Sequence, residues 1–232
     1  MLSGGIYNIS VEIMSVLNDQ ISATLPPQLY VPQPIQLLFD WIEENGFLCE
    51  LWNGSMGGRL ADSYDFNEAE TEKFGGTGIY FEAQGNYHLR HWLGNDDPDI
   101  LNRLYVFAQT GGDGSMAAFW RDDSGQQKIV HLGSGSGSTM VCVLADDPVD
   151  FLRLIAIGYE EICWPDVLFD EPNGNQDLDY FIHPNRKYQS WVRETFDVTI
   201  PEFGVDIVME PAEMMHTASD DPFWIWCETH CG

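Results

Sequence analysis

Three possible metal ligands fall within one short turn of the sequence: Cys227, His230 and Cys231. Thiolate and imidazole groups are the usual ligands of Zn²⁺. The cluster supplies three ligands at most, and no second group of Cys and His is present to complete a tetrahedral site. The other cysteines complete it only if the tail folds onto them: Cys49, Cys142 and Cys163. We therefore expect no metal ion here and an exposed, oxidation-prone tail.

A second pair of possible ligands, His88 and His91, lies within the segment 87–93. Two imidazoles three residues apart share a face on a helix, whereas on a strand they point to opposite faces. The aromatic content of the segment predicts a strand. We therefore expect two separate surface or edge histidines and no shared metal site.

The glycine- and serine-rich segment 133–139 invites comparison with phosphate-binding loops. Ser138 stands where a dinucleotide fingerprint requires its third glycine, and no Lys follows as in a P-loop. The next residues, Met140 to Leu144, have the pattern of a strand, so no helix N-terminus is available to hold an anion. This pattern predicts a flexible hairpin loop rather than a phosphate site.

Pairs of carboxylates carry little information in this chain, because 37 Asp and Glu face only ten Lys and Arg. Asp96, Asp97 and Asp99, or Asp122 and Asp123, have the residue types of a Mg²⁺-dependent nuclease. Such an enzyme must attract a polyanion, and a formal net charge of -27 opposes that. No Gly-x-Ser-x-Gly elbow occurs, and no cysteine lies in a catalytic signature. The sequence therefore predicts no enzyme and no cofactor.

The same charge favours one class of partner. A strongly negative field repels nucleic acids and anionic membranes, whereas it attracts basic proteins and speeds their encounter. The first residues have no basic n-region, and no apolar run approaches the roughly 20 residues that span a bilayer. The five cysteines are odd in number and mostly lie in apolar contexts. We expect a cytoplasmic protein with reduced, mostly buried thiols.

Four segments of the sequence have the pattern of a helix. Apolar spacing predicts an amphipathic helix over 9–21 and a second helix that begins near Pro34 and ends at Gly46. Asp147, followed by Pro148 and Asp150, marks the best-defined helix start, and Gly158 closes that helix. Its residues Leu152 and Ile155 are expected to be fully buried. A fourth amphipathic helix is predicted over 185–196.

Short aromatic or β-branched runs between turn residues predict the strands. They cover 47–52, a hairpin formed by 78–83 and 87–93, and further strands near 104–108, 116–120, 128–132 and 139–144. We predict an exposed acidic stretch over 61–73, a long loop after Asn53-Gly54, and short strands or an irregular cover at 205–208 and 223–227. The pattern favours an α+β fold with a central, mainly antiparallel sheet flanked by helices, in a single domain over 1–232.

Several segments together resemble the SUKH superfamily, which contains the Smi/Knr-type proteins and many bacterial immunity proteins. They are a helix with Leu38, Phe39 and Trp41, a strand pair near Tyr80 and Trp92, Thr110-Gly-Gly-Asp-Gly114, Trp120 before Asp-Asp-Ser-Gly, and Asp-Asp-Pro-Val-Asp-Phe-Leu152. The resemblance covers about 35–160, so residues 165–232 are expected to form a C-terminal extension. It implies a SUKH-like fold and a protein that binds other proteins without chemistry of its own.

In bacteria, proteins of this kind typically neutralise polymorphic toxins by stoichiometric binding. The resemblance therefore implies an immunity-type protein whose partner is a cognate toxin domain, expected to be basic and nuclease-like. The alternative is an acidic regulatory scaffold or adaptor of the same superfamily. Acidic loops near the sheet edge are the expected binding residues: Asp62, Asp65, Glu68, Glu70, Asp96, Asp97, Asp99, Asp113, Asp122 and Asp123.

Overall fold

The computed structural model describes residues 15–62, 75–174, 181–214 and 218–231. Within these ranges the chain forms an α+β fold around a seven-stranded sheet in which each strand pairs with the next in sequence, always antiparallel. The strands are β1 (Leu48–Glu50), β2 (Met56–Arg59), β3 (Tyr80–Gly85), β4 (Leu104–Gln109), β5 (Met116–Arg121), β6 (Gln127–Leu132) and β7 (Val141–Ala145). The predicted mainly antiparallel sheet is thus confirmed.

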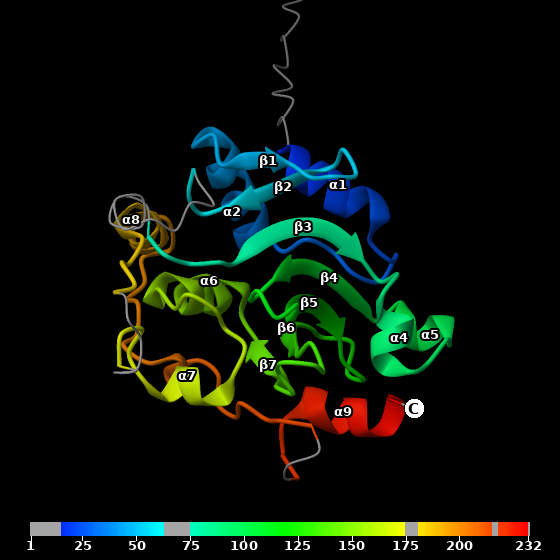
Figure 1. Cartoon of the computed structure of the whole chain (residues 1–232). Helices are drawn as coiled ribbons and strands as arrows, with labels where there is room; N and C mark the ends of the chain where they lie inside the picture. The colour runs from blue at the N-terminus through cyan, green and yellow to red at the C-terminus, as the bar shows by residue number, and fades with distance from the viewer. Residues whose placement is uncertain (1–14, 63–74, 175–180, 215–217, 232) are drawn as a thin grey trace, which may run out of the picture.

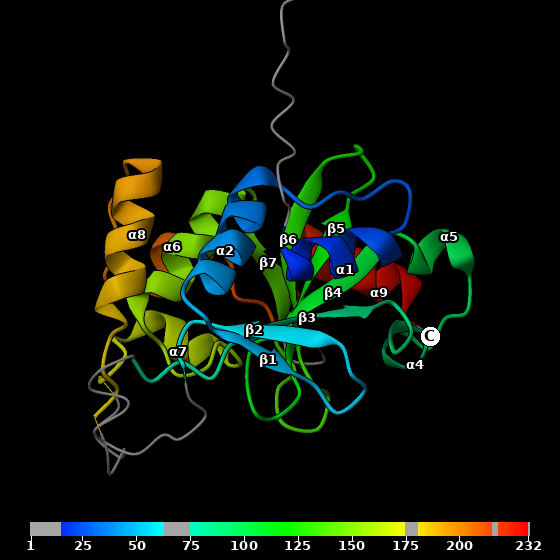
Figure 2. The same cartoon turned by 90° about the horizontal axis from the view of Figure 1, so that it is seen from above.

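Helices lie on both sides of this sheet (Figures 1 and 2). They are α1 (Val16–Thr24), α2 (Gln33–Glu44), α4 (Leu89–Leu93), α5 (Pro98–Leu101), α6 (Pro148–Ile157), α7 (Pro165–Phe169), α8 (Arg186–Phe196), the 3-10 helix η1 (Gly204–Asp206) and α9 (Pro222–His230). In Figure 1, α1 and α2 lie at the top beside β1 to β3, whereas α9 lies at the bottom beside β7. None of the described helices is long and apolar enough to cross a membrane.

The larger core lies between the sheet and α1, α2 and α6. Its centre is a row of aromatic rings, in which Phe107 stacks on Phe119 at 4.1 Å and meets Phe151 of α6 edge-on at 5.6 Å. Phe119 lies opposite Tyr105 in the β4–β5 pair, and Phe107 is the next residue of β4 on the same face, at the register shift between Val106 and Ala108. Leu152 and Ile155 are 0% and 3% exposed, so the prediction that α6 is a core helix is confirmed.

A smaller core occupies the opposite face. Trp120 of β5 packs against Phe223 and Trp226 of α9, with ring centroids 5.1 and 5.8 Å apart. The expectation of strands or irregular cover was wrong for 223–227, which is helical, whereas 205–208 includes a 3-10 turn. Asp221 supplies the N-cap of α9 and Pro222 its first turn, a start signal that resembles the one at Asp147 and Pro148.

The helix starts and stops predicted from capping residues agree with the structure. The Asp147 carboxylate accepts a hydrogen bond from the Val149 amide at 2.8 Å, and Gly158 closes α6 with φ of 104°. Pro34 lies in the first turn of α2, and Asn185 caps α8. The predicted first helix reaches Thr24, three residues beyond its expected end, and its expected start lies outside the described residues.

The segment 87–93 is a helix, not the second strand of a hairpin. Gly85, with φ of 73°, ends β3, and α4 then buries Leu89 and Leu93 on one face. Aromatic content indicated a strand, whereas the four-residue spacing of the two leucines is the helical signal. His88 therefore caps a helix and His91 lies within it, which corrects the premise that placed them on a strand.

The predicted long loop after Asn53-Gly54 contains β2. Gly57 and Gly58 lower the strand propensity of this segment, because glycine is depleted in strands, so the sequence did not indicate β2. A Cβ atom at Gly58 would lie 2.4 Å from Leu17 Cδ1 and 2.9 Å from Ile42 Cγ2, so glycine is what lets α1 and α2 approach the sheet here. Ala61 and Asp62 are described, whereas the rest of the predicted acidic stretch, 63–73, lies outside the described residues.

Candidate functional site

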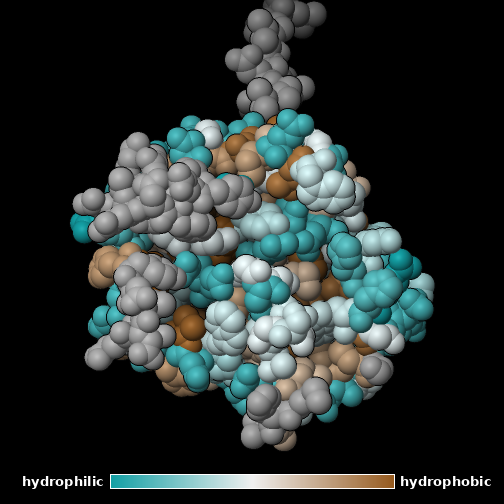
Figure 3. Space-filling model, viewed as in Figure 1, coloured by the Kyte–Doolittle hydropathy of each residue, from teal (hydrophilic) through white to brown (hydrophobic). Residues whose placement is uncertain are grey.

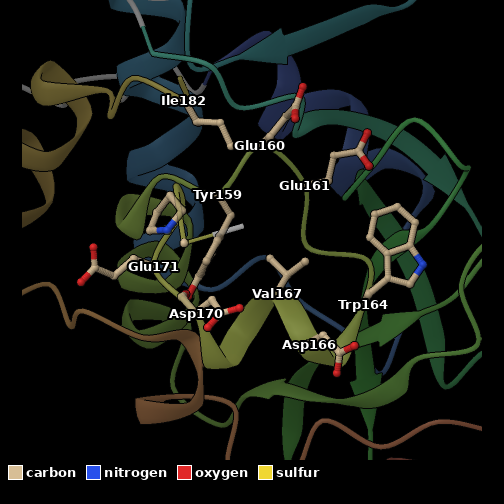
Figure 4. Close-up of a pocket in the computed structure, with 11 residues that line it drawn as sticks. Tyr159, Glu160, Glu161, Trp164, Asp166, Val167, Asp170, Glu171 and Ile182 are labelled. Carbon is tan, nitrogen blue, oxygen red and sulfur yellow. The ribbon is translucent and has the colours of Figure 1, made fainter. Parts of the chain in front are cut away.

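An open cleft of about 540 Å³ lies where α6 gives way to α7. The chain between Tyr159 and Gly174 forms most of it, and Ile182 closes one side. Figure 4 shows five carboxylates arranged around Tyr159 and Val167. These are Glu160, Glu161, Asp166, Asp170 and Glu171. The cleft thus has an apolar floor and an acidic rim.

Backbone contacts with distant strands hold the wall of the cleft. The Glu160 carbonyl accepts a hydrogen bond from the Gly78 amide at 2.7 Å, and the Ile162 amide donates to the Thr110 carbonyl at 2.9 Å. Pro165 then starts α7, whose proline suits a first turn. The segment 159–165 is therefore tied to the ends of β3 and β4, although it has no regular structure of its own.

Tyr159 fixes the floor. Its hydroxyl donates to the Asp170 carbonyl at 2.8 Å and accepts from the Gly204 amide at 2.9 Å, so it joins the end of α7 to the start of η1. Burial is the main cause that raises the pKa of Tyr159. The phenol stays neutral at physiological pH and acts as a structural bridge.

Three of the five rim carboxylates are open to solvent. Glu161 Oε1 accepts a hydrogen bond from the Gly112 amide at 2.7 Å, whereas Asp166, Asp170 and Glu171 are exposed. Among the described residues, the ion pairs lie elsewhere and join Arg103 to Asp123, Lys128 to Asp146 and Arg153 to Asp150. None of the described residues that line the cleft is a Lys or an Arg. Asp166, Asp170 and Glu171 therefore offer negative charge at the rim that these ion pairs leave uncompensated.

Trp164 adds an aromatic face to this rim. It stands just before α7, and its indole is 38% exposed. The indole Nε1 donates a long hydrogen bond, 3.5 Å, to the Gly137 carbonyl of the β6–β7 loop. A cation near carboxylates and an indole gains both charge-assisted hydrogen bonds and cation–π attraction. The arrangement suits the side chain of a Lys or Arg, whose methylenes match the apolar floor.

Behind the rim lies a polar network centred on Asp113. Its carboxylate accepts hydrogen bonds from the hydroxyls of Ser115 and Ser134, both at 2.9 Å, and from the Ser115 amide at 2.9 Å. Burial alone would raise the pKa of Asp113, but these hydrogen bonds hold it below its ordinary value. Asp113 thus binds the β6–β7 loop to the start of β5.

This network contains no activated nucleophile. The Cys163 thiol contacts Asp113 Oδ1 at 3.4 Å, and burial, followed by the nearby charges of Asp113 and Glu161, raises its pKa. His131 lies in the same region and is fully buried, with Nε2 3.0 Å from Thr110 Oγ1 and Nδ1 2.9 Å from the Met140 carbonyl. A protonated thiol and an engaged imidazole are suited to packing rather than to nucleophilic attack.

The segment 133–139 forms the β6–β7 connection, as the hairpin prediction requires. Ser134 Oγ accepts hydrogen bonds from the amides of Gly137 and Ser138, at 2.9 and 3.2 Å. A phosphate-binding loop directs such amides to its anion. In this loop the two amides donate to Ser134 instead.

The expected partner-binding residues are not brought together. Asp65, Glu68 and Glu70 lie outside the described residues, and Asp62 follows β2. Asp96, Asp97 and Asp99 are exposed around the start of α5, where Asp97 is the N-cap. Asp113 precedes β5, whereas Asp122 and Asp123 follow it at the opposite end. Asp122 accepts from the Gln126 amide at 2.8 Å, and Asp123 pairs with Arg103.

Of the possible metal ligands at the C-terminal end, the thiols of Cys227 and Cys231 are in hydrogen-bond contact. Within the part of the chain that the structure describes, no group of three or more His, Cys, Asp and Glu side chains is arranged to hold a metal ion. Cys227 is buried in the smaller core, and the His230 ring packs on Trp226 at 4.8 Å. All five cysteines are free, and three of them, Cys142, Cys163 and Cys227, are buried.

The cleft itself was missed in the sequence, although one signal pointed to it. Between Arg153 and Arg186 no Lys or Arg occurs, whereas seven acidic residues do: Glu160, Glu161, Asp166, Asp170, Glu171, Asp177 and Asp179. Such a one-sided stretch around a Trp is a candidate for binding cations.

Comparison with known proteins places no further constraint on the site. No family model, no curated protein and no solved structure matches this chain.

Proposed function

We propose that this chain is a non-enzymatic, immunity-type protein with a SUKH-like fold, which binds and neutralises a basic toxin domain. The observation that carries the proposal is the acidic cleft, because the exposed carboxylates of Asp166, Asp170 and Glu171 lie beside an apolar floor and none of the described lining residues is basic. A partner that inserts a Lys or Arg supplies the missing charge. The proposal also places the protein in the cytoplasm, where it meets an incoming toxin.

The geometry supports capture of one cationic side chain as an anchor. The aliphatic part of an inserted Lys or Arg packs on Tyr159 and Val167. Its charged end lies between Asp166, which is on the same side as the Trp164 ring, and the carboxylates of Asp170 and Glu171 on the opposite side. Anchors that fill a pocket carry a large share of the binding energy in protein interfaces. The net charge of -27 acts at longer range and speeds the encounter.

The proposal gives the C-terminal extension a role. Residues after 165 contribute α7, which forms the lower wall of the cleft, and Ile182, which forms its side. The remainder of the extension packs α8 on α6 and α9 on β7. Extending the resemblance to the SUKH core, we infer that this region adapts a general scaffold to one particular toxin.

The test screens basic bacterial toxin domains against this chain, with binding measured by calorimetry and neutralisation by rescue of growth in a bacterial host. The cleft variant Asp166→Lys/Asp170→Lys/Glu171→Lys should weaken binding by about 100-fold, or ~3 kcal/mol, and abolish rescue. The matched control, Asp96→Lys/Asp99→Lys/Glu228→Lys, makes the same change in net charge at exposed positions near α5 and α9. It should alter affinity by only a few-fold.

The two triple variants separate the cleft from the general field. Equal weakening by both variants would show that only net charge matters, and a larger loss in the control would move the site to the α5 region. Full rescue by the cleft variant would reject the cleft as the toxin-binding site.

A further inference from the structure

The two edge strands of the sheet, β7 and β1, differ in how their outward backbone groups are hydrogen-bonded. Along β7 the edge is covered: the Val141 amide donates to the Ala212 carbonyl at 2.8 Å, and Met140 forms an isolated antiparallel bridge with Glu213. The Val143 amide donates to Asp221 Oδ2 at 2.9 Å. The outward-facing amides of Val141 and Val143 thus have hydrogen-bond acceptors within the protein, which protects this edge from pairing with other chains.

The edge at β1 has no such cover among the described residues. β1 is the terminal strand of the sheet, and β2 is its partner on one side. The Arg59 amide donates to the Phe47 carbonyl at 3.1 Å, and the Leu51 amide donates to the Ser55 carbonyl at 2.8 Å. Because an antiparallel ladder alternates, the backbone groups of Leu48 and Glu50 point away from β2. They form an open row for a further strand.

Next to this row a rigid turn presents an indole to solvent. Trp52 is 98% exposed and begins the β1–β2 turn. The turn is ordered by hydrogen bonds from the Gly54 amide to the Leu51 carbonyl at 2.9 Å and from the Ser55 amide to Asn53 Oδ1 at 2.9 Å. Gly54 has φ of 81°, which favours glycine at this point. An exposed Trp held on an ordered turn is a common anchor in protein interfaces.

The geometry points to strand addition: the outer edge of β1 binds an extended, Lys- or Arg-rich segment of a partner protein as an eighth strand, with Trp52 packing on that segment. Backbone hydrogen bonds to Leu48 and Glu50 supply the register, as in other peptides that extend a sheet. Charge selects the occupant, because the exposed Glu50 is the last residue of β1, the exposed Glu44 ends α2 just before it, and the whole chain carries -27. A second copy of so acidic a chain is repelled, whereas a basic segment is attracted. This inference does not depend on the acidic cleft.

Hydrogen exchange of single amides, followed by NMR, tests the inference on the full chain. The probe is a synthetic octapeptide of alternating Lys and Val, at saturating concentration. The amides of Leu48 and Glu50 should be protected at least about 10-fold by the peptide, whereas the Cys49 amide, which faces Gly57 of β2, should not change. The same peptide with an N-methyl group on every residue should give no protection, because neither of its edges can then donate hydrogen bonds or approach β1 closely.

Two substitutions complete the test. Trp52→Ala should weaken peptide binding by about 10-fold or more, whereas Met209→Ala, which removes another side chain that is 86% exposed, should leave it unchanged. The inference would be overturned if the peptide bound without protecting Leu48 and Glu50, or bound Trp52→Ala with equal affinity. Binding would then be due to general charge attraction. Protection that rises with protein concentration in the absence of peptide would overturn it in favour of a second copy.

Discussion

At the scale of single residues, His131 links stability to pH. Burial lowers its pKa to about 4, since the charged imidazole loses its hydration inside the sheet. The neutral ring still satisfies both neighbours, because one nitrogen can donate to the Met140 carbonyl while the other accepts from the Thr110 hydroxyl. Folding therefore favours the uncharged form.

The sign of the pH dependence follows from this shift. In the unfolded chain the histidine titrates near ~6.5, so between that pH and about 4 the unfolded state binds more protons and stability falls as the pH falls. Between about pH 7 and pH 5 the loss should be roughly 2 kcal/mol. Urea unfolding of the wild type and of His131→Gln at both pH values measures it, and the variant controls for the many carboxylates. Equal pH dependence in the two proteins would contradict this role.

The cysteines should differ in reactivity. A hydrogen bond from the Cys227 thiol lowers the pKa of Cys231, which is half-buried at the end of α9, whereas burial raises the pKa of Cys142, Cys163 and Cys227. Iodoacetamide at mildly alkaline pH should label Cys231 well before those three in the native protein. Peptide mass spectrometry measures the order, with Cys231→Ser as the control. Earlier labelling of Cys163 would mean that the region behind the cleft opens.

At the scale of elements, α6 is the helix on which the larger core depends. Leu152→Ala should lower the free energy of unfolding by about 2 to 5 kcal/mol, because it removes buried methyl groups and leaves a cavity. Ser190→Ala on the exposed face of α8 should change it by less than about 0.5 kcal/mol. Denaturant melts compare the two. A small loss at Leu152 would show that the core can collapse around α6.

Asp221 joins two elements at once. Its Oδ1 accepts from the amides of Phe223 and Trp224, both at 2.9 Å, while its Oδ2 accepts from Val143 of β7. Asp221→Ala leaves these donors without their acceptor, so it should cost about 2 to 3 kcal/mol, more than the usual loss of a cap. The matched variant Asp147→Ala at the N-cap of α6 should cost about 1 kcal/mol. Thermal unfolding of both would test the difference.

Local signals explain which elements can be predicted from sequence. β4, β5 and β7 are nearly continuous apolar runs between turns, and β6 has the apolar residues Ile129, Val130 and Leu132. α6 has a capping residue, a proline and a terminal glycine, so pattern and structure agree in these elements. α4 and α9 are short and rich in aromatic residues, which favour strands when tertiary contacts are unknown. The cleft depends on contacts such as Gly78 with Glu160, which are far apart in sequence and carry no local signal.

At the scale of the whole molecule, the charge is widely spread. In Figure 3 hydrophilic residues dominate the visible face, and the hydrophobic areas on it are small and separate. Specific binding by such a surface requires local features, here the cleft and the open strand edge, while the net charge of -27 affects any basic partner. Affinity and encounter rate should therefore respond differently to substitution.

Salt separates the two effects. Stopped-flow association with the basic toxin domain should slow by about 10-fold or more between 50 and 500 mM salt, because screening removes long-range attraction. The dissociation rate should change less with salt and rise mainly in the cleft variant Asp166→Lys/Asp170→Lys/Glu171→Lys. An association rate independent of salt would reject electrostatic steering and leave the cleft to be judged by dissociation alone.

The sequential order of the strands also bears on how the chain folds during synthesis. Each strand pairs with the one made just before it, so the sheet can grow as the polypeptide leaves the ribosome. The face that bears Trp120 and Val130, however, is covered by α9, which is made after all seven strands. Until α9 has emerged, that apolar face stays exposed on an otherwise assembled sheet. The nascent chain is therefore most prone to aggregation between the emergence of β7 and that of α9, when a chaperone has most to protect.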